Sequence, residues 1–396
     1  MIPYGHQDIT AADIDAVVQV LRSDYLTQGP AVPRFEQAVA SRVGCAYAIA
    51  VNSATSALHI SCAALGLGPG DWLWTVPNTF VASANCGRYC GAQVDFVDID
   101  AASWNLSVPR LEEKLARAEQ AGRLPKVVVP VHFAGQPTEQ EAIWKLAEKY
   151  GFSVLEDASH AIGASRNGEP VGSCRWSHIT VFSFHPVKIV TSGEGGMALT
   201  NDAELAARLR MLRSHGITRE PSRFGLPHGA GRVGESVATQ GAWYYEQQLL
   251  GFNYRLTDIH AALGASQMTR LTDYVERRNS LAGRYQSALR DMPLRLPSVS
   301  AENRSAFHLY VVRLVAADRS AHRRVFDELR RQGVGVNLHY MPVHLQPYYR
   351  ALGFVPGQFP EAEAHGDQAI TLPLFATLSD QAQDGIVDCV KRALQN

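Results

Sequence analysis

The chain has 396 residues, of which 46% are hydrophobic and 19% charged, so it can bury a large core and divide into two domains. Its 37 basic residues nearly balance its 38 acidic ones without a long block of like charge, which leaves nucleic acids and anionic membranes no electrostatic basis for binding. No segment approaches the ~20 apolar residues of a membrane span, and no leader-like pattern occurs, so we expect a cytoplasmic protein that binds small molecules.

The first predicted helix begins after Thr10, whose hydroxyl can cap it together with Asp13. Apolar residues from Ile14 to Leu21 then fall on one helical face. Short apolar runs separated by helix-length segments follow, and they predict buried strands at residues 46–51, 72–76, 94–97, 127–131, 153–155, 179–183 and 197–200. This alternation is typical of an α/β domain with a mostly parallel sheet.

The second half of the chain changes character at residues 220–248, which are rich in Gly, Arg, Ser and Gln and predict a long surface loop or insertion. A long helical stretch follows Asp258, and a strand at 308–314 and a helix around 325–329 then form a smaller α/β unit. We therefore predict a large domain over residues 1–258 and a small C-terminal domain over residues 259–396.

The spacing of cysteines and histidines in the sequence does not predict a metal site. The six cysteines are dispersed, which suits reduced thiols, and Cys86 and Cys90 lie in a helical stretch where packing is the simpler interpretation. His339 and His344 are five residues apart, a spacing that suits neither a helical pair nor a completed zinc site. We expect no metal.

The strongest chemical signal is a lysine and an acid that each follow a buried strand. Lys188 comes after the apolar run at 181–184 and before a glycine-rich turn at 191–196, and Asp157 ends the strand before it. Pyridoxal phosphate needs both groups, because a lysine forms an imine with its aldehyde and an acid holds its pyridine nitrogen protonated. An acid at the end of a Val and Leu strand is costly to bury without such a partner.

Weaker signals accompany this pair. Residues 52–58 are rich in small hydroxyl side chains and open a helix, which predicts a phosphate cup, although a plain N-cap is the alternative. Phe80 follows a strand and could cover a cofactor ring, and His160 is placed to bond the phenolic oxygen; a core phenylalanine and a satisfied core histidine are the alternatives. Ser183 and Asn253 are candidate phosphate ligands.

The chain contains no GxGxxG and no GxxxxGK[ST] pattern, which removes the main nucleotide-cofactor alternatives.

This ordered series resembles the DegT/DnrJ/EryC1/StrS sugar aminotransferases over essentially the whole chain, and within them the UDP-4-keto-sugar transaminases of pseudaminic acid biosynthesis. The closer match is carried by Ile2-Pro3-Tyr4, Leu26-Thr27-Gln28-Gly29-Pro30, the run from Ser183 to Lys188, Asn253-Tyr254-Arg255-Leu256-Thr257-Asp258, and the long segment from His339 to Tyr349. The resemblance implies an α/β fold of the type I pyridoxal phosphate transferases, similar to aspartate aminotransferase. The stretch from 221 to 240 looks longer than in typical members.

The resemblance also implies roles for single residues. Lys188 would be the imine lysine, Asp157 the partner of the pyridine nitrogen, Phe80 the stacking ring and His160 a neighbour of the phenolic oxygen. Ala54, Thr55 and Ser183 would surround the phosphate, and Asn253 would reach it from the partner subunit of a homodimer. The nucleotide sugar would contact a further set, namely Tyr4, Leu26, Thr27, Gln28, His185, His308 and Tyr310.

The reaction implied is transfer of an amino group from L-glutamate to C4 of a UDP-linked 4-keto-6-deoxy-N-acetylhexosamine. It would convert UDP-2-acetamido-2,6-dideoxy-β-L-arabino-hexos-4-ulose into UDP-4-amino-4,6-dideoxy-N-acetyl-β-L-altrosamine. The alternatives are an aminotransferase for another nucleotide 4-keto or 3-keto sugar, a sugar dehydratase on the same scaffold, and a binding protein that kept the fold. The dehydratases resemble this chain but replace the lysine with histidine, so Lys188 argues against that alternative.

Overall fold

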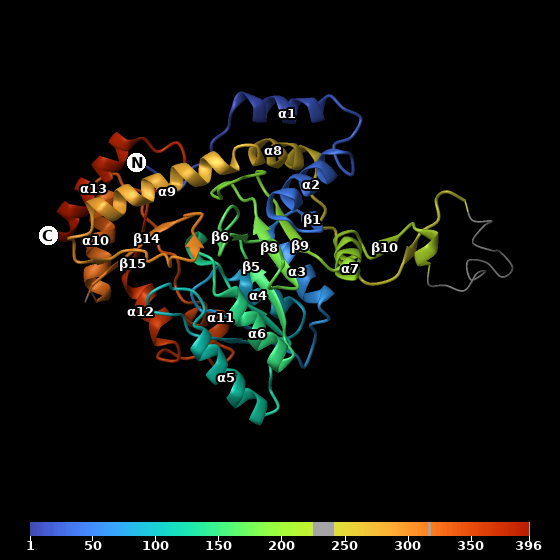
Figure 1. The fold of residues 1–396 in the computed structure, drawn as a ribbon, viewed down its shortest axis with the longest axis horizontal. Coiled ribbons are helices and arrows are strands. Elements are labelled where there is room, and N and C mark those ends of the chain that lie inside the picture. Colours follow the sequence, from blue (N-terminus) through green and yellow to red (C-terminus); the bar gives the residue numbers. More distant parts are fainter. Residues whose placement is uncertain (225–240, 316–317, 396) are drawn as a thin grey trace.

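The computed structural model describes residues 1–224, 241–315 and 318–395 (Figure 1). A seven-stranded sheet lies at its centre in the order β1-β9-β8-β5-β4-β2-β3. Its strands are β1 (Tyr47–Val51), β2 (Trp72–Thr75), β3 (Gln93–Phe96), β4 (Val127–Val129), β5 (Ser153–Asp157), β8 (Ile179–Ser183) and β9 (Gly196–Thr200). Only the pairs of β9 with β1 and β8 are antiparallel. The predicted α/β architecture with a mostly parallel sheet is confirmed.

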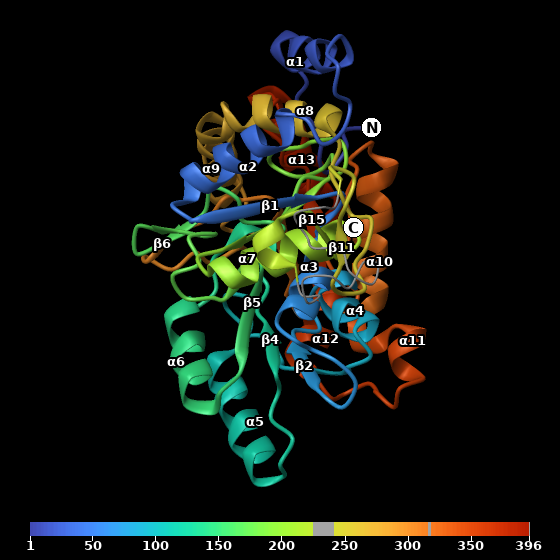
Figure 2. The ribbon, with the colours of Figure 1, turned by 90° about the vertical axis from the view of Figure 1, so that its right-hand side faces the viewer.

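Helices cover both faces of this sheet, as parallel connections require. Figure 2 shows α5 and α6 on one side of β4 and β5, and α3 and α4 on the other. The strands bury both faces, and β4 and β8 are buried at every position. The helices between its strands are α3 (Ala54–Ala64), α4 (Ala82–Tyr89), α5 (Val108–Gln120) and α6 (Gln140–Tyr150), while α2 (Ala31–Val43) precedes β1 and α7 (Ala203–Arg213) follows β9.

A smaller sheet lies in the C-terminal part in the order β12-β14-β15. It consists of β12 (Leu294–Arg295), β14 (Tyr310–Leu314) and β15 (Ala369–Leu372), and its core is formed almost wholly by C-terminal residues. The helices that follow residue 257 are α8 (Asp258–Met268), α9 (Leu271–Ala288), α10 (Arg319–Arg331), α11 (Pro347–Arg350), α12 (Pro360–Gln368) and α13 (Asp380–Gln395). The buried residues of α8 pack with α2 rather than with this smaller sheet. The division into two domains at residue 258 stays a prediction.

Two small sheets complete the fold. Strand β6 (Ser165–Arg166) pairs with β7 (Glu169–Pro170) and β13 (Asn303–Arg304). Strands β10 (Ile217–Thr218) and β11 (Glu246–Gln247) form a ribbon that projects from the body of the molecule (Figure 1). This ribbon flanks the predicted insertion at 220–248, whose residues 225–240 lie outside the described residues. None of the helices in the described ranges is long and apolar enough to cross a bilayer.

Helix α1 (Ala11–Leu21) has the predicted capping box between Thr10 and Asp13, but its apolar face is only partly buried. Asp13 is its only fully buried residue, whereas Ile14 and Leu21 are 56% and 55% exposed. The helix lies along α8 (Figure 1), where Asp13 accepts hydrogen bonds from Ser266 (2.6 Å), Gln267 (2.9 Å) and Arg270 (2.6 Å). A buried acid thus anchors α1 together with partly buried Ala16 and Val20, and Ile14 and Leu21 stay exposed.

Replacing Asp13 by Ala should detach α1, because three donors then lose a charged acceptor at a buried position. We expect a loss of about 2–4 kcal/mol in the free energy of unfolding. Urea unfolding and amide hydrogen exchange in α1 measure this effect. Asp15→Ala is the matched control, since Asp15 is an exposed acid of the same helix. Equal stabilities of the two variants would contradict the anchoring role of Asp13.

Candidate active site

A cavity of about 450 Å³ opens at the carboxyl ends of β5 and β8, where the two parallel strands end side by side. Ligand sites of α/β sheets are typically found at such an edge. The sequence-predicted residues that line it are Tyr4, Ala54, Thr55, Phe80, Asp157, His160, Ser183, His185, Lys188 and His308. These residues come from distant parts of the chain, so the fold assembles in one place most of the predicted site.

Asp157 ends β5 and is 5% exposed. Its Oδ1 accepts a hydrogen bond from the amide of Ser159 (3.1 Å), and its Oδ2 accepts one from the hydroxyl of Ser83 (2.6 Å). Hydrogen bonds to both oxygens hold the carboxyl group in one orientation. The cavity therefore contains a fixed acid that can pair with a protonated nitrogen.

Lys188 places its amine in the same cavity. Burial lowers the pKa of this amine to about 8, although the charge of Asp157 acts in the opposite direction. A pKa of about 8 leaves about a tenth of the amines neutral at pH 7, against fewer than about one in a thousand for an ordinary lysine. A neutral amine is the nucleophile that attacks an aldehyde, so Lys188 is suited to imine formation.

Three buried histidines lie near this amine. Burial and the charge of Lys188 hold the pKa values of His160 and His308 well below the ordinary value, and they lower that of His339 to about 3. Nδ1 of His160 accepts from the amide of Ala134 (3.3 Å), so Nε2 carries the ring proton. That Nε2 lies 3.1 Å from the hydroxyl of Tyr340. His160 is therefore a neutral hydrogen-bond donor on the cavity side.

The phosphate cup predicted at residues 52–58 is the start of α3. Ser53 caps this helix by accepting from the amide of Ser56 (3.1 Å), and the first amides of the helix, those of Ala54 and Thr55, have no partner within it. Gly196 of β9 passes directly beneath, where a Cβ atom would lie 2.4 Å from the backbone of Ser53 and Ala54. The helix start can approach the sheet only because residue 196 is glycine.

These residues fit pyridoxal phosphate. The free amides of α3 and the hydroxyl of Ser183 can bind a phosphate, Asp157 can accept from a protonated ring nitrogen, and Lys188 supplies the amine. Phe80 is 58% exposed at the cavity wall although Thr79 beside it is buried, which leaves one aromatic face open to a ring. Within the described ranges no cluster of three or more metal-ligating side chains occurs, and all six cysteines are free.

Five predicted site residues do not line the cavity of their own chain. Leu26, Thr27, Gln28 and Asn253 are exposed elsewhere on the surface. Tyr310 corrects the prediction outright: it is fully buried in the small C-terminal core, its ring 4.8 Å from that of Tyr285. His308 precedes β14 and lines the cavity, whereas Tyr310 is the first residue of β14 and packs in the C-terminal core, where its hydroxyl donates to Gln286 of α9 (3.1 Å).

Several lining residues were missed by the sequence prediction. His339 and Tyr340 belong to the long motif at 339–349 that carried the family resemblance, so a signal for them existed. Ser159 follows Asp157 closely and could have been inferred from the strand end. Asn337 and Glu194 gave no signal of their own, because a single polar residue in a loop is usually solvated.

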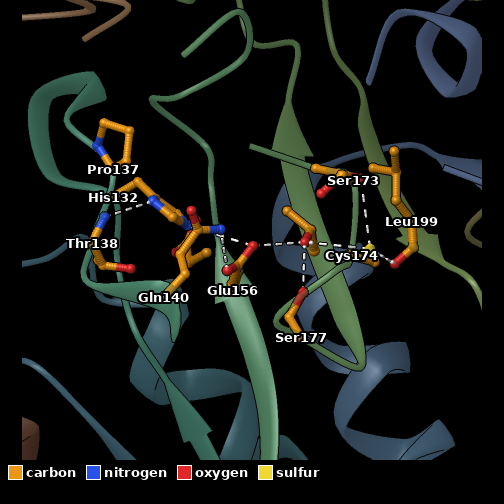
Figure 3. A network of polar contacts seen from close by, with 12 residues as sticks. His132, Pro137, Thr138, Gln140, Glu156, Ser173, Cys174, Ser177 and Leu199 are labelled. Carbon is orange, nitrogen blue, oxygen red and sulfur yellow. Dashed lines mark hydrogen bonds and ion pairs between the residues drawn. The ribbon is translucent and has the colours of Figure 1, made fainter. Parts of the chain in front are cut away.

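A second buried polar network lies on the opposite face of β5 from the cavity (Figure 3). Glu156 accepts from Gln140 (2.6 Å) and from Thr180 of β8 (2.8 Å), and Nε2 of His132 lies 3.6 Å from it. Burial alone would raise the pKa of Glu156, but the contacts with His132, Gln140 and Thr180 outweigh it and lower the pKa. These bonds tie β5 to β8 immediately beside Asp157 and so stiffen the edge that carries the site.

The comparisons with known proteins identify the family of this chain. Residues 7–391 match the model of the DegT/DnrJ/EryC1/StrS aminotransferase family. The chain belongs to this family. It is 36% identical over 394 residues to the spore coat polysaccharide biosynthesis protein SpsC of Bacillus subtilis, covering 98% of this chain and 96% of that protein.

Solved structures extend the comparison. Spr1654 from Streptococcus pneumoniae in its PLP form superposes with a TM-score of 0.89 at 29% identity, covering 100% of this chain and 98% of that one. PseC of Helicobacter pylori, an aminotransferase involved in pseudaminic acid biosynthesis, gives a TM-score of 0.88 at 28% identity, covering 100% and 99%. The predicted fold, the pyridoxal phosphate cofactor and the enzyme class are confirmed: the protein is a pyridoxal phosphate-dependent sugar aminotransferase.

The lowered pKa of Lys188 predicts how the apoprotein captures its cofactor. The rate of capture, followed by the yellow colour of the bound cofactor, should rise with pH and level off above about 8, because only the neutral amine attacks. Asp157→Asn should move this midpoint to lower pH, since the charge of Asp157 raises the pKa of Lys188. Lys188→Ala should abolish both colour and turnover. A midpoint near the ordinary lysine value of 10.5 would contradict the burial of the amine.

Proposed function

We propose that the enzyme transfers an amino group from L-glutamate to C4 of UDP-2-acetamido-2,6-dideoxy-β-L-arabino-hexos-4-ulose. The product would be UDP-4-amino-4,6-dideoxy-N-acetyl-β-L-altrosamine, a precursor of pseudaminic acid-type surface sugars. The observation that carries the proposal is the single cavity that joins Lys188 and Asp157 with Tyr4, His308 and His339. Support for this sugar comes from the motifs shared with the pseudaminic acid transaminases and from the structural likeness to PseC.

Each residue has a defined task in this proposal. Bound pyridoxal phosphate supplies an electron sink that stabilises negative charge on the reacting carbon. Lys188 would hold the cofactor at rest and, as a free amine, would move the proton at the substrate carbon. Asp157 would hold the ring nitrogen protonated, His160 would donate to the phenolic oxygen, and Phe80 would cover the ring. The amides of α3 and the hydroxyl of Ser183 would anchor the phosphate.

Two alternatives differ in the chemistry that they require. An aminotransferase for another nucleotide keto-sugar would use the same catalytic groups, because the shape of the substrate side of the cavity selects the sugar. The likeness to SpsC, a protein of spore coat polysaccharide biosynthesis, supports that alternative. A sugar dehydratase would need histidine in place of the lysine, and the amine of Lys188 in the cavity argues against it.

A panel of UDP- and dTDP-linked keto-sugars with L-glutamate as the amino donor tests the proposal. We expect fastest formation of 2-oxoglutarate with the UDP-linked L-arabino 4-keto sugar, and NMR of the product should show nitrogen at C4. Lys188→Ala is the control for uncatalysed transfer. Faster turnover of a 3-keto sugar, or loss of a hydroxyl without consumption of glutamate, would exclude this assignment.

We further propose that the enzyme is a homodimer whose subunits share their active sites. Two of the residues that miss their own cavity lie against the segment that follows Asn253: Thr27 forms an antiparallel bridge with Thr257, and Asp258 donates its amide to the carbonyl of Leu26 (3.0 Å). Asn253 belongs to the same segment and is exposed. The neighbouring apolar side chains are also exposed, namely Ile9, Ile14, Leu21, Tyr25 and Leu26 at 45–56%. An apolar surface of this kind beside unused ligand groups suits a self-complementary interface.

Mixing two inactive variants tests the shared site. If Asn253 acts in the partner's cavity, a heterodimer of Lys188→Ala and Asn253→Ala subunits carries one doubly damaged site and one intact site. Activity should then return toward half of the wild-type value per heterodimer. Native mass spectrometry verifies that heterodimers form. Heterodimers no more active than the parent variants would rule out a shared site and leave the proposed reaction untouched.

A further inference from the structure

Two buried hydroxyl groups support the carboxylate of Asp157 from behind. The hydroxyl of Ser83 lies 2.6 Å from Oδ2 of Asp157, and the hydroxyl of Thr79 lies 2.7 Å from that of Ser83. Ser83 is fully buried and Thr79 is 3% exposed. Both flank Phe80 at the start of α4, so one short turn carries the aromatic wall of the cavity and the support of its acid.

The direction of these hydrogen bonds follows from the acceptors. An ionised carboxylate can only accept, so the proton of Ser83 lies toward Asp157. The oxygen of Ser83 is then free to accept from Thr79, which can donate its own proton. The carbonyl of Phe80, 3.3 Å from the hydroxyl of Ser83, is a longer and neutral alternative acceptor. Bonds to a charged acceptor are about twice as strong as neutral ones, so the arrangement favours donation to Asp157.

The chain from Thr79 through Ser83 therefore ends on the carboxylate of Asp157. A hydroxyl that donates to a carboxylate makes a shorter and stronger bond than one that donates to a neutral acceptor. Adjacent hydroxyl groups that donate in series also strengthen one another in a buried setting. The result is a carboxylate held in one orientation where it faces the cofactor site.

We propose that Ser83, oriented by Thr79, is a positioning residue that holds the carboxylate of Asp157 in place, so that Asp157 can hold the ring nitrogen of bound pyridoxal phosphate protonated. This inference rests on the role of Asp157 in the proposed function. Ser83 does not line the cavity and acts only through the acid. Thr79 lies in the cavity wall, and its part in this proposal is the hydrogen bond with Ser83.

The test measures the protonation of the cofactor itself. Holoenzyme loaded with pyridoxal phosphate that carries ¹⁵N in its ring is titrated from mildly acidic to mildly basic pH, and the ¹⁵N shift reports the pKa of the ring nitrogen. Ser83→Ala should lower that pKa by about one to two units, because the lost bond is one to a charged group. Thr79→Val should lower it by less, and Ser83→Thr, which keeps a hydroxyl, should retain most of the wild-type value.

Ser61→Ala is the matched control. Ser61 is a fully buried serine of α3 whose hydroxyl has no hydrogen-bond partner, so its loss removes a buried oxygen without touching the carboxylate. We expect its ring-nitrogen pKa to equal that of the wild type. In Ser83→Ala, kcat should also fall about tenfold with the KM for the sugar unchanged, since the sugar contacts remain.

The outcomes separate this inference from the function on which it rests. If Asp157→Asn lowers the ring-nitrogen pKa while Ser83→Ala behaves like Ser61→Ala, the role of Ser83 is overturned and that of Asp157 stands. If Asp157→Asn also leaves the nitrogen protonated, the assignment of Asp157 fails first. Should Ser83→Ala not fold, Thr79→Val carries the test, and an unchanged ring-nitrogen pKa in that variant overturns the proposal.

Discussion

The parallel pairing of β5 with β8 is the constraint on which the active site depends. Asp157 lies opposite Val181 in this pair, so both strands run in one direction and end at the same edge of the sheet. The acid ends the first strand, and the lysine follows the second by a short turn. Burial disfavours the charge of Lys188, and the proximity of Asp157 offsets part of that cost. The carboxylate of Asp157 and the amine of Lys188 therefore stabilise each other at this apolar edge of the sheet and form a reactive pair.

The phosphate side of the cavity depends on one glycine in the antiparallel strand. Gly196 of β9 lies opposite Val51 on one side and opposite Ser183 on the other. It therefore joins the strand that leads into α3 with the strand that leads to Lys188. A side chain at this position would push the start of α3 away from the sheet, because a Cβ atom would lie 2.4 Å from Ser53 and Ala54. The phosphate anchor and the lysine are thus held in register by backbone contact rather than by side-chain packing.

The sequence predicts the parts of this enzyme that depend on local pattern. All seven strands of the large sheet follow from apolar runs, and Lys188 and Asp157 follow from their places at strand ends. The sequence does not predict which side chains are buried by contacts between distant elements. Tyr310 is an aromatic residue in the strand next to His308, and only the packing of α9 on β14 decides that its ring is core. The sequence also does not predict what buries the apolar face of α1. Helical spacing shows that this face exists, but it does not show whether residues of this chain or of another chain cover it.

The segment that exposes Asn253 packs on α3, the helix whose first residues line the cavity. Phe252 and Tyr254 stack at 4.9 Å and pack on His59 of α3, and the hydroxyl of Tyr254 lies 3.1 Å from Nδ1 of that histidine. The carbonyl of Tyr254 accepts from the amide of Asn52, next to the cap of the same helix. In an extended segment, side chains alternate, so two aromatic residues that face inward leave Asn253 facing outward. Helix α3, whose first residues line the cavity, therefore also supports the segment that exposes Asn253, and the two are joined by direct contact.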